Sequence, residues 1–171
     1  MKLFFAVIFF VGFFSSCSST IYVVRHAEKQ TGGNNSMMTA DPDLTENGKL
    51  RAKALADTLV TKKITAVFAT QYKRTQQTAE PTAALKATSI KVYDAAKGEQ
   101  LIDSLSHRKN KGYLVVGHSN TIIPMLLKLG LNPSIKEIPD NDFDNLFTVK
   151  IKGFLGRTIR LKESTYGTVS P

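Results

Sequence analysis

Two of the three histidines in this 171-residue chain follow short apolar runs of nearly the same sequence. The runs that end in His26 and His118, Val-Val-Arg-His and Val-Val-Gly-His, are typical of buried strands. In open sheets of parallel strands, ligands bind beyond the carboxyl ends of the strands. We therefore expect His26 and His118 to share a site. His107, which lies in a basic stretch, is expected to be a structural or surface residue.

Two arginines accompany these histidines in the sequence. Arg25 directly precedes His26, and Arg74 opens a polar segment after another apolar run. Guanidinium groups bind phosphate oxygens through directed, charge-assisted hydrogen bonds. Nearby positive charge also lowers the pKa of a histidine, which keeps the imidazole neutral and nucleophilic. The pattern predicts a phosphoryl site. It disfavours a divalent metal ion, since the cations would repel one and no HExxH or CxxC spacing occurs. No cofactor is expected.

Alternating apolar and amphipathic segments must position these side chains. Strands are expected at residues 21–24, 66–69, 90–93 and 113–116, with helices at 44–63, 74–87, 100–105 and 121–129. This alternation predicts an α/β fold, a three-layer α/β/α arrangement around a mainly parallel sheet. Residues 147–161 alternate around a Gly-Phe-Leu-Gly turn, which predicts an antiparallel hairpin at the sheet edge. Four basic residues of this hairpin would discourage further strand pairing: Lys150, Lys152, Arg160 and Lys162.

Four motifs, in order along the chain, resemble those of the histidine phosphatase superfamily, the phosphoglycerate mutase-like enzymes, in its small single-domain branch. They are Ile21-Tyr22-Val23-Val24-Arg25-His26-Ala27-Glu28, Leu44-Thr45-Glu46-Asn47-Gly48, Arg74 with Gln77-Thr78-Ala79, and Val116-Gly117-His118-Ser119. The resemblance runs from residue 21 to residue 129. One departure is Ala27, which stands where the family usually has glycine.

The resemblance implies a role for each matching residue. His26 would attack phosphorus and become a phosphohistidine that water later hydrolyses. Arg25, Arg74 and His118 would hold the phosphoryl oxygens and stabilise their charge in the transition state. The helix expected to start near Ser119 would add backbone N–H groups.

The proton for an alcohol leaving group needs a separate donor, a carboxyl with a raised pKa. Many family members place a glutamate after the third strand, and this chain has no clear match to it. Asp94, at the end of residues 90–93, is the first candidate and Glu99 the second. Glu28 and Asp43 are interpreted as structural or rim residues. If no carboxyl serves, substrates with good leaving groups, such as phosphohistidine or acyl phosphate, are favoured.

Residues 1–16 have the pattern of an export signal. Lys2 precedes twelve apolar residues, 3–14, which span about 18 Å as a helix, short of a ~30 Å membrane core. Phe14-Ser15-Ser16-Cys17 resembles the lipobox of bacterial lipoproteins. This predicts cleavage before Cys17, lipidation of that cysteine, and attachment of a single domain, residues 17–171, to the bacterial envelope, on its periplasmic face or at the cell surface. Secretion with cleavage elsewhere and a retained anchor are the alternatives.

The net charge of the chain, and the placement of its basic residues, limit the classes of partner that are expected. Twenty-three Lys and Arg residues against 14 Asp and Glu residues give a formal charge of +9, and removal of residues 1–16 lowers it to +8. Because the basic residues are not interleaved with aromatic ones, nucleic acid is not the expected partner. The sequence predicts an envelope-tethered phosphatase for a small phosphate monoester. The alternative is a non-catalytic lipoprotein that binds a phosphorylated ligand. The oligomeric state is left open.

Overall fold

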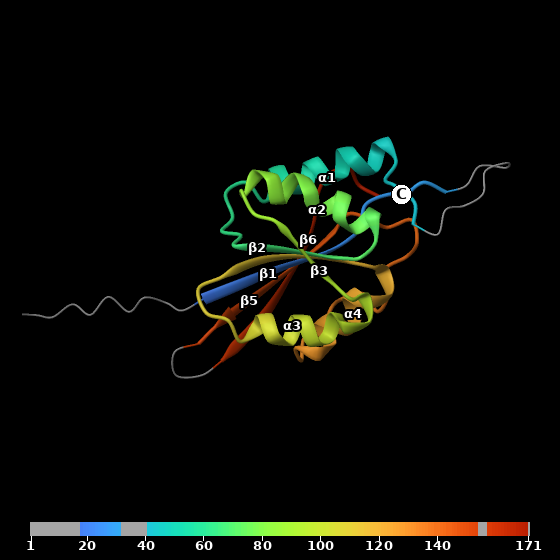
Figure 1. Cartoon of the computed structure of the whole chain (residues 1–171). Coiled ribbons are helices and arrows are strands. Elements are labelled where there is room, and N and C mark those ends of the chain that lie inside the picture. Colours follow the sequence, from blue (N-terminus) through green and yellow to red (C-terminus); the bar gives the residue numbers. More distant parts are fainter. Residues whose placement is uncertain (1–17, 32–40, 154–156, 171) are drawn as a thin grey trace, which may run out of the picture.

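The apolar runs form one six-stranded sheet in the order β3-β2-β4-β1-β5-β6. The computed structural model describes residues 18–31, 41–153 and 157–170, so the predicted signal segment and Cys17 lie outside the described residues. The elements are β1 (Ser18–Arg25), α1 (Glu46–Thr58), β2 (Ala66–Thr70), α2 (Lys73–Leu85), β3 (Ile90–Tyr93), η1 (Ala95–Lys97), α3 (Gly98–Ser106), β4 (Gly112–Gly117), α4 (Ser119–Lys128), β5 (Asn145–Lys152) and β6 (Thr158–Thr165). Figure 1 shows their arrangement.

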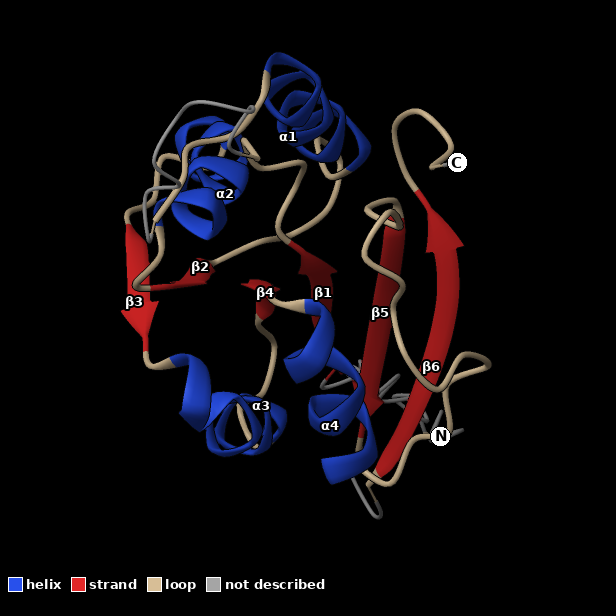
Figure 2. Ribbon diagram, turned by 90° about the vertical axis from the view of Figure 1, so that its right-hand side faces the viewer, coloured by secondary structure: helices blue, strands red, loops and turns tan. Residues whose placement is uncertain are grey.

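The predicted fold class is confirmed. Strands β3, β2, β4 and β1 are parallel, and β5 and β6 continue the sheet as an antiparallel pair. Helices α1 and α2 lie on one side of the sheet, and α3 and α4 on the other (Figure 2). Alternate strand residues supply two cores. Val23 and Val115 face α3 and α4, whereas Val24 and Val116 belong to the core beneath α1 and α2. Burial on both faces explains the continuous apolar runs.

The helices begin near the residues expected from the sequence, and α1 ends earlier than predicted. The hydroxyl oxygen of Thr45 accepts a hydrogen bond from the N–H of Gly48 at 3.0 Å, which caps α1. A Cβ at Gly48 would collide with the carbonyl of Glu28, so this position of the Leu-Thr-x-x-Gly motif requires glycine. Helix α2 continues through Pro81 as one helix. Among the described residues, no helix is long and apolar enough to cross a membrane.

Candidate active site

The carboxyl ends of β1 and β4 open into a pocket of about 480 Å³. The chain leaves β1 and β4 toward opposite sides of the sheet, which makes this edge the switch point where α/β proteins bind ligands. The N–H of His26 donates to the carbonyl of Gly117 at 2.9 Å, and the His26 and His118 rings lie 5.4 Å apart between centroids. The pocket is lined by Arg25, His26, Lys29, Tyr72, Arg74, Ala95, Ala96, His118, Ser119, Asn120, Thr121 and Asp140. The structure therefore brings the two predicted histidines and the two predicted arginines together.

His26 is held as a neutral imidazole with one nitrogen available. Its side chain is buried, and Nδ1 lies 2.8 Å from the carbonyl oxygen of Ala27. Because a carbonyl only accepts, Nδ1 carries the hydrogen and Nε2 keeps its lone pair. Burial, followed by the charges of Arg25, His118 and Arg74, lowers the pKa of His26 to about 3, although the bond to Ala27 opposes this shift. The free Nε2 is the arrangement that a nucleophile requires.

His118 is oriented by a relay of two threonine hydroxyls. Its Nε2 lies 3.0 Å from Oγ1 of Thr70, which lies 2.8 Å from Oγ1 of Thr75. The Thr75 hydroxyl donates to the carbonyl of Tyr72 at 2.7 Å, so Thr70 donates to Thr75 and His118 Nε2–H donates to Thr70. Burial, and then the charges of Arg74 and Arg25, lower the pKa of His118 to about 4.

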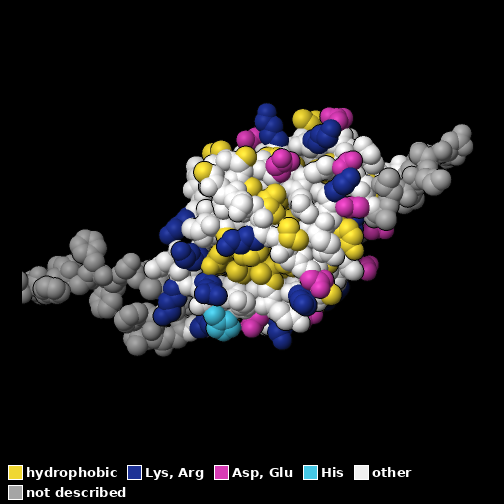
Figure 3. Space-filling view, viewed as in Figure 1, with side chains coloured by type: hydrophobic (Ala, Val, Ile, Leu, Met, Phe, Trp, Pro, Cys, Tyr) yellow, Lys and Arg dark blue, Asp and Glu magenta, His cyan; other side chains and the backbone are white. Residues whose placement is uncertain are grey.

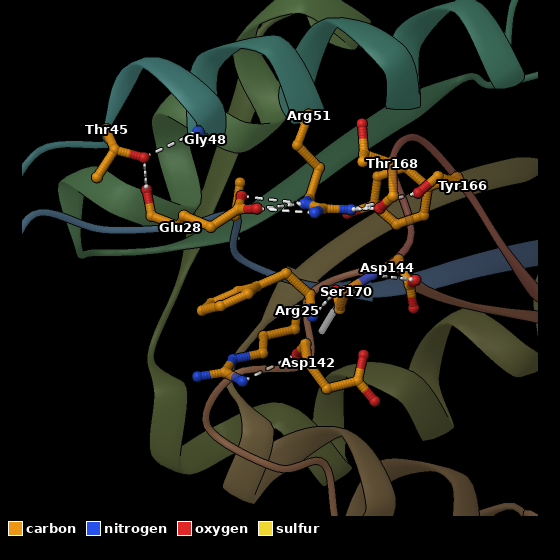
Figure 4. A network of polar contacts seen from close by, with 12 residues as sticks. Arg25, Glu28, Thr45, Gly48, Arg51, Asp142, Asp144, Tyr166, Thr168 and Ser170 are labelled. Atoms are coloured by element: carbon orange, nitrogen blue, oxygen red, sulfur yellow. Dashed lines mark hydrogen bonds and ion pairs between the residues drawn. The ribbon is translucent and has the colours of Figure 1, made fainter.

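Arg25 is fixed by the segment that precedes β5. Its Nη1 donates to the backbone carbonyls of Pro139, at 2.6 Å, and Asp142, at 2.9 Å (Figure 4). Its Nη2 lies 3.6 Å from the Asp140 carboxylate, and its guanidinium carbon lies 4.3 Å from the ring centroid of Phe143. Burial lowers the pKa of Arg25, while the acidic residues around it, Asp140 first, act in the opposite direction. These contacts hold the guanidinium at the pocket wall.

A polar network at the C-terminus holds this segment in turn (Figure 4). The N–H of Ser170 donates to the carboxylate of Asp144 at 2.8 Å. Arg51 binds the Glu28 carboxylate, with Nε to Oε1 at 2.8 Å, and also donates to the carbonyl of Thr168 at 2.8 Å. The carboxylate of Glu28, two residues after His26, is thus occupied by an ion pair, as its structural interpretation requires.

Arg74 enters the pocket from the first turn of α2. Its guanidinium carbon lies 4.4 Å from the ring centroid of Tyr72, and its Nη1 lies 3.7 Å from the carboxylate of Asp41. The hydroxyl of Thr78, one turn further along α2, accepts from the N–H of Ala27 at 2.9 Å, which ties this helix to the chain beside His26. Among the described residues, the Nε–H groups of Arg25 and Arg74 are buried without a hydrogen-bond partner. Each guanidinium thus keeps at least one N–H donor that no described residue accepts.

The two carboxyls predicted as acids are not in the pocket lining. Asp94 is exposed, and its carboxylate turns back to cap η1 by accepting from the N–H of Ala96 at 3.0 Å. Glu99 is exposed in the first turn of α3. Asp43 accepts from the side-chain amide of Gln77 at 2.8 Å, which is a structural contact. Their roles in the reaction stay predictions.

Asp140 is the carboxylate that does line the pocket, and the sequence analysis did not identify it. Its side chain is fully exposed apart from the contact with Arg25. It belongs to a segment without helical or strand periodicity, so the sequence carries no signal for its position. Thr70 was also missed, although it directly follows residues 66–69 and the rule that selected the histidines applies to it.

The remaining polar candidates fall as follows. Ser119 and Asn120, at the start of α4, line the pocket, as does Lys29. His107 lies outside the pocket lining, and its Nε2 accepts from Arg157 at 3.2 Å. Among the residues that the structure describes, no group of three or more His, Cys, Asp and Glu side chains could hold a metal ion.

The chain was compared with family models, curated proteins and solved structures. The family model for the histidine phosphatase superfamily (branch 1) matches residues 21–97. No curated protein sequence matches the chain.

Solved structures share the fold at low sequence identity. One described as a mycobacterial hydrolase aligns with a TM-score of 0.66 at 13% identity, covering 91% of this chain and 93% of that chain. The protein histidine phosphatase SixA, complexed with tungstate, aligns with a TM-score of 0.64 at 16% identity over 85% and 96%. A mycobacterial glucosyl-3-phosphoglycerate phosphatase aligns with a TM-score of 0.61 at 14% identity over 87% and 98%. The chain is thus similar to the histidine phosphatase superfamily in the motifs of residues 21–97, and it shares its fold with these solved structures.

Proposed function

We propose that the chain is a phosphatase that acts through a phosphohistidine on His26. The observation that carries this proposal is the hydrogen bond of 2.8 Å between His26 Nδ1 and the carbonyl of Ala27, which leaves Nε2 unprotonated in the pocket. Arg25 and Arg74 line the same pocket, and their guanidinium donors suit the oxygens of a phosphoryl group, whereas His118 lines the pocket with its Nε2–H bound to Thr70. Structural neighbours described as phosphatases support this reaction class.

The reaction has two steps. The Nε2 lone pair of His26 attacks phosphorus in line, a P–N bond forms, and the P–O bond to the leaving group breaks. Water then attacks the same phosphorus, the P–N bond breaks, and inorganic phosphate leaves with the proton balance restored by solvent. Arg25 and Arg74 stabilise the charge on the phosphoryl oxygens in both steps, because they surround the pocket without needing to reorganise.

A labelling experiment tests the first step directly. The protein is incubated with an aryl phosphate labelled on phosphorus and then denatured. We expect a phosphoryl adduct that is stable to base, labile to acid, and located on His26. The His26→Ala variant should form no adduct and show no turnover, whereas His107→Ala, outside the pocket, should behave as the unchanged protein. Turnover by His26→Ala would contradict the proposal.

We also propose that the enzyme is tethered to the bacterial envelope through lipid on Cys17. The support is the sequence of residues 1–17, in which an apolar run of twelve residues ends at Ser-Ser-Cys. Two acyl chains on one cysteine would give stable anchoring, whereas a single chain binds membranes only marginally. The Cys17→Ala variant should leave the membrane fraction of cells. Its retention there, together with an uncleaved leader, would contradict the lipoprotein proposal and favour a retained anchor.

A non-catalytic phospholigand-binding protein is the second candidate. It is favoured by one observation: the described pocket lining contains no carboxylate other than the exposed Asp140. Such a protein would bind phosphate or tungstate tightly at Arg25 and Arg74 and release no product from any ester. Calorimetric titration with phosphate, run beside the labelling experiment, separates the two candidates.

A further inference from the structure

The face of the β5–β6 hairpin carries four cations close together. Lys150 lies directly opposite Arg160 in the strand register. Lys152 follows Lys150 by two residues on β5, and Lys162 follows Arg160 by two residues on β6, so all four side chains lie on the same face of the sheet. All four side chains are exposed, and together with Thr158 and Leu161 they line a groove of about 390 Å³. We call Lys150, Lys152, Arg160 and Lys162 the cationic hairpin face.

This arrangement costs stability. Like charges that face each other across two strands repel, and no ion pair involves any of the four among the described residues. Protection of a sheet edge explains only half of the cluster. Arg160 and Lys162 lie on β6, the edge strand, but Lys150 and Lys152 lie on β5, which is paired on both sides, by β1 and β6. The remaining explanation is an anionic partner.

The position of the hairpin identifies that partner. Ser18, where residues 1–17 join the domain, pairs in register with Lys152. The sequence that precedes Ser18 contains twelve consecutive apolar residues, 3–14. A membrane that holds this segment, or a lipid attached near it, would lie beside the hairpin. Cations placed beside a bilayer meet anionic lipid headgroups. Each Lys or Arg near such a surface raises the partition coefficient of the protein onto it by about five-fold.

The same end of the sheet carries further basic residues. The loop between α3 and β4 contains Arg108, Lys109 and Lys111, all exposed, and the carbonyl of Lys111 accepts from the N–H of Thr20 at the start of β1. In Figure 3, Lys and Arg side chains gather at the end where β1 begins in the same view of Figure 1, and most acidic side chains of that face lie elsewhere. The pocket lies at the opposite ends of the strands.

We propose that the cationic hairpin face docks on an anionic lipid surface. Bound in this way, the domain would face the membrane with the amino end of β1 and hold the pocket, at the carboxyl ends of β1 and β4, toward solvent. The proposal concerns orientation at the membrane and is independent of the phosphatase reaction.

The test is partitioning of the full chain onto phosphatidylcholine vesicles with and without phosphatidylglycerol. Because residues 1–17 are the same in every protein compared, the gain on anionic vesicles isolates the charged surface. One variant changes the four residues of the cationic hairpin face to glutamine. The control variant removes four exposed cations elsewhere, Lys49, Lys53, Lys97 and Lys136, so that both variants have the same net charge.

We expect the hairpin variant to lose the anionic gain, by about 600-fold for four cations, and the control variant to retain most of it. Urea unfolding should show that the hairpin variant is at least as stable as the unchanged protein, since repulsion has been removed, and hydrolysis of a soluble aryl phosphate should be unaltered. Equal losses in both variants would mean that net charge alone drives binding, and would overturn the proposal. So would the absence of an anionic gain, or hairpin-dependent binding of a single-stranded oligonucleotide that is tighter than vesicle binding.

Discussion

Replacing His26 by asparagine should make the folded protein more resistant to acid while it abolishes turnover. Burial, and then the positive charges in the pocket, lower the pKa of His26 to about 3, whereas an unfolded histidine titrates near 6.5. Below pH 6.5 the unfolded chain therefore binds a proton that the folded chain does not. The stability that neutral His26 contributes is fully present above pH 6.5 and is lost as the pH falls toward 3. At about 1.4 kcal/mol per pH unit, acidification to pH 4 removes roughly 3 kcal/mol of the free energy of unfolding.

Asparagine is a suitable replacement because its amide can donate to the carbonyl of Ala27, as Nδ1 does, without titrating. The assay is urea unfolding of both proteins at pH 7 and pH 4. The difference in their free energies of unfolding should shift by about 3 kcal/mol in favour of the variant at pH 4. His118 is present in both proteins, so its contribution to the pH dependence largely cancels from the difference in their free energies of unfolding. Between pH 7 and pH 8.5 the difference should not change, which is the internal control. A shift below about 1 kcal/mol at pH 4 would refute the reasoning that the pocket keeps His26 neutral.

Three further results are expected. Once corrected for ionisation of the substrate, kcat/KM for an aryl phosphate should stay constant as the pH falls through 6.5 and decrease only below about pH 4. The reason is that His26 must be neutral to attack phosphorus. A loss of activity centred at pH 6.5 would contradict this. Asp94→Asn should affect alkyl and aryl phosphates equally, because its carboxylate caps η1; a selective loss on alkyl phosphates would assign it the acid role. Arg51→Met should lower the free energy of unfolding by about 3 kcal/mol, since Glu28 would lose its buried partner. Arg51→Lys should recover part of that free energy. Unchanged urea midpoints would exclude the ion pair as a stabilising contact.

Local sequence patterns were sufficient for the elements and for half of the site. Continuous apolar runs marked the parallel strands because both of their faces are buried, and the residue that follows such a strand lies at the ligand-binding edge. That rule placed His26 and His118 correctly beside each other, and the same rule would have placed Thr70. The position of Arg74 followed from the start of a helix after a strand.

The remaining features depend on contacts between distant segments. Asp94 ends its strand as predicted, but its side chain turns toward the N–H of Ala96, and no periodicity encodes that choice. Asp140 reaches the pocket because Arg25 binds the carbonyls of Pro139 and Asp142 and so holds a segment without regular structure. The cationic hairpin face was interpreted as edge protection, yet only the sheet order shows that two of its members lie on a strand that is not an edge.

The placement of the carboxylates decides which leaving groups the pocket can serve. All 14 Asp and Glu residues lie within the described residues, because residues 1–17, 32–40 and 154–156 contain none. Of these, only Asp140 lines the pocket, and its side chain is solvated rather than buried. An alkoxide must be protonated as it leaves, whereas a carboxylate leaves as the anion and a protonated imidazole leaves as the neutral ring. We therefore expect kcat/KM to rank acyl phosphate and phosphohistidine above aryl phosphate, and aryl far above alkyl phosphate. Alkyl and acyl phosphates hydrolysed at equal rates would show that a proton donor operates in the pocket, and Asp140→Asn would then be the first variant to examine, because it removes the carboxylate that lines the pocket.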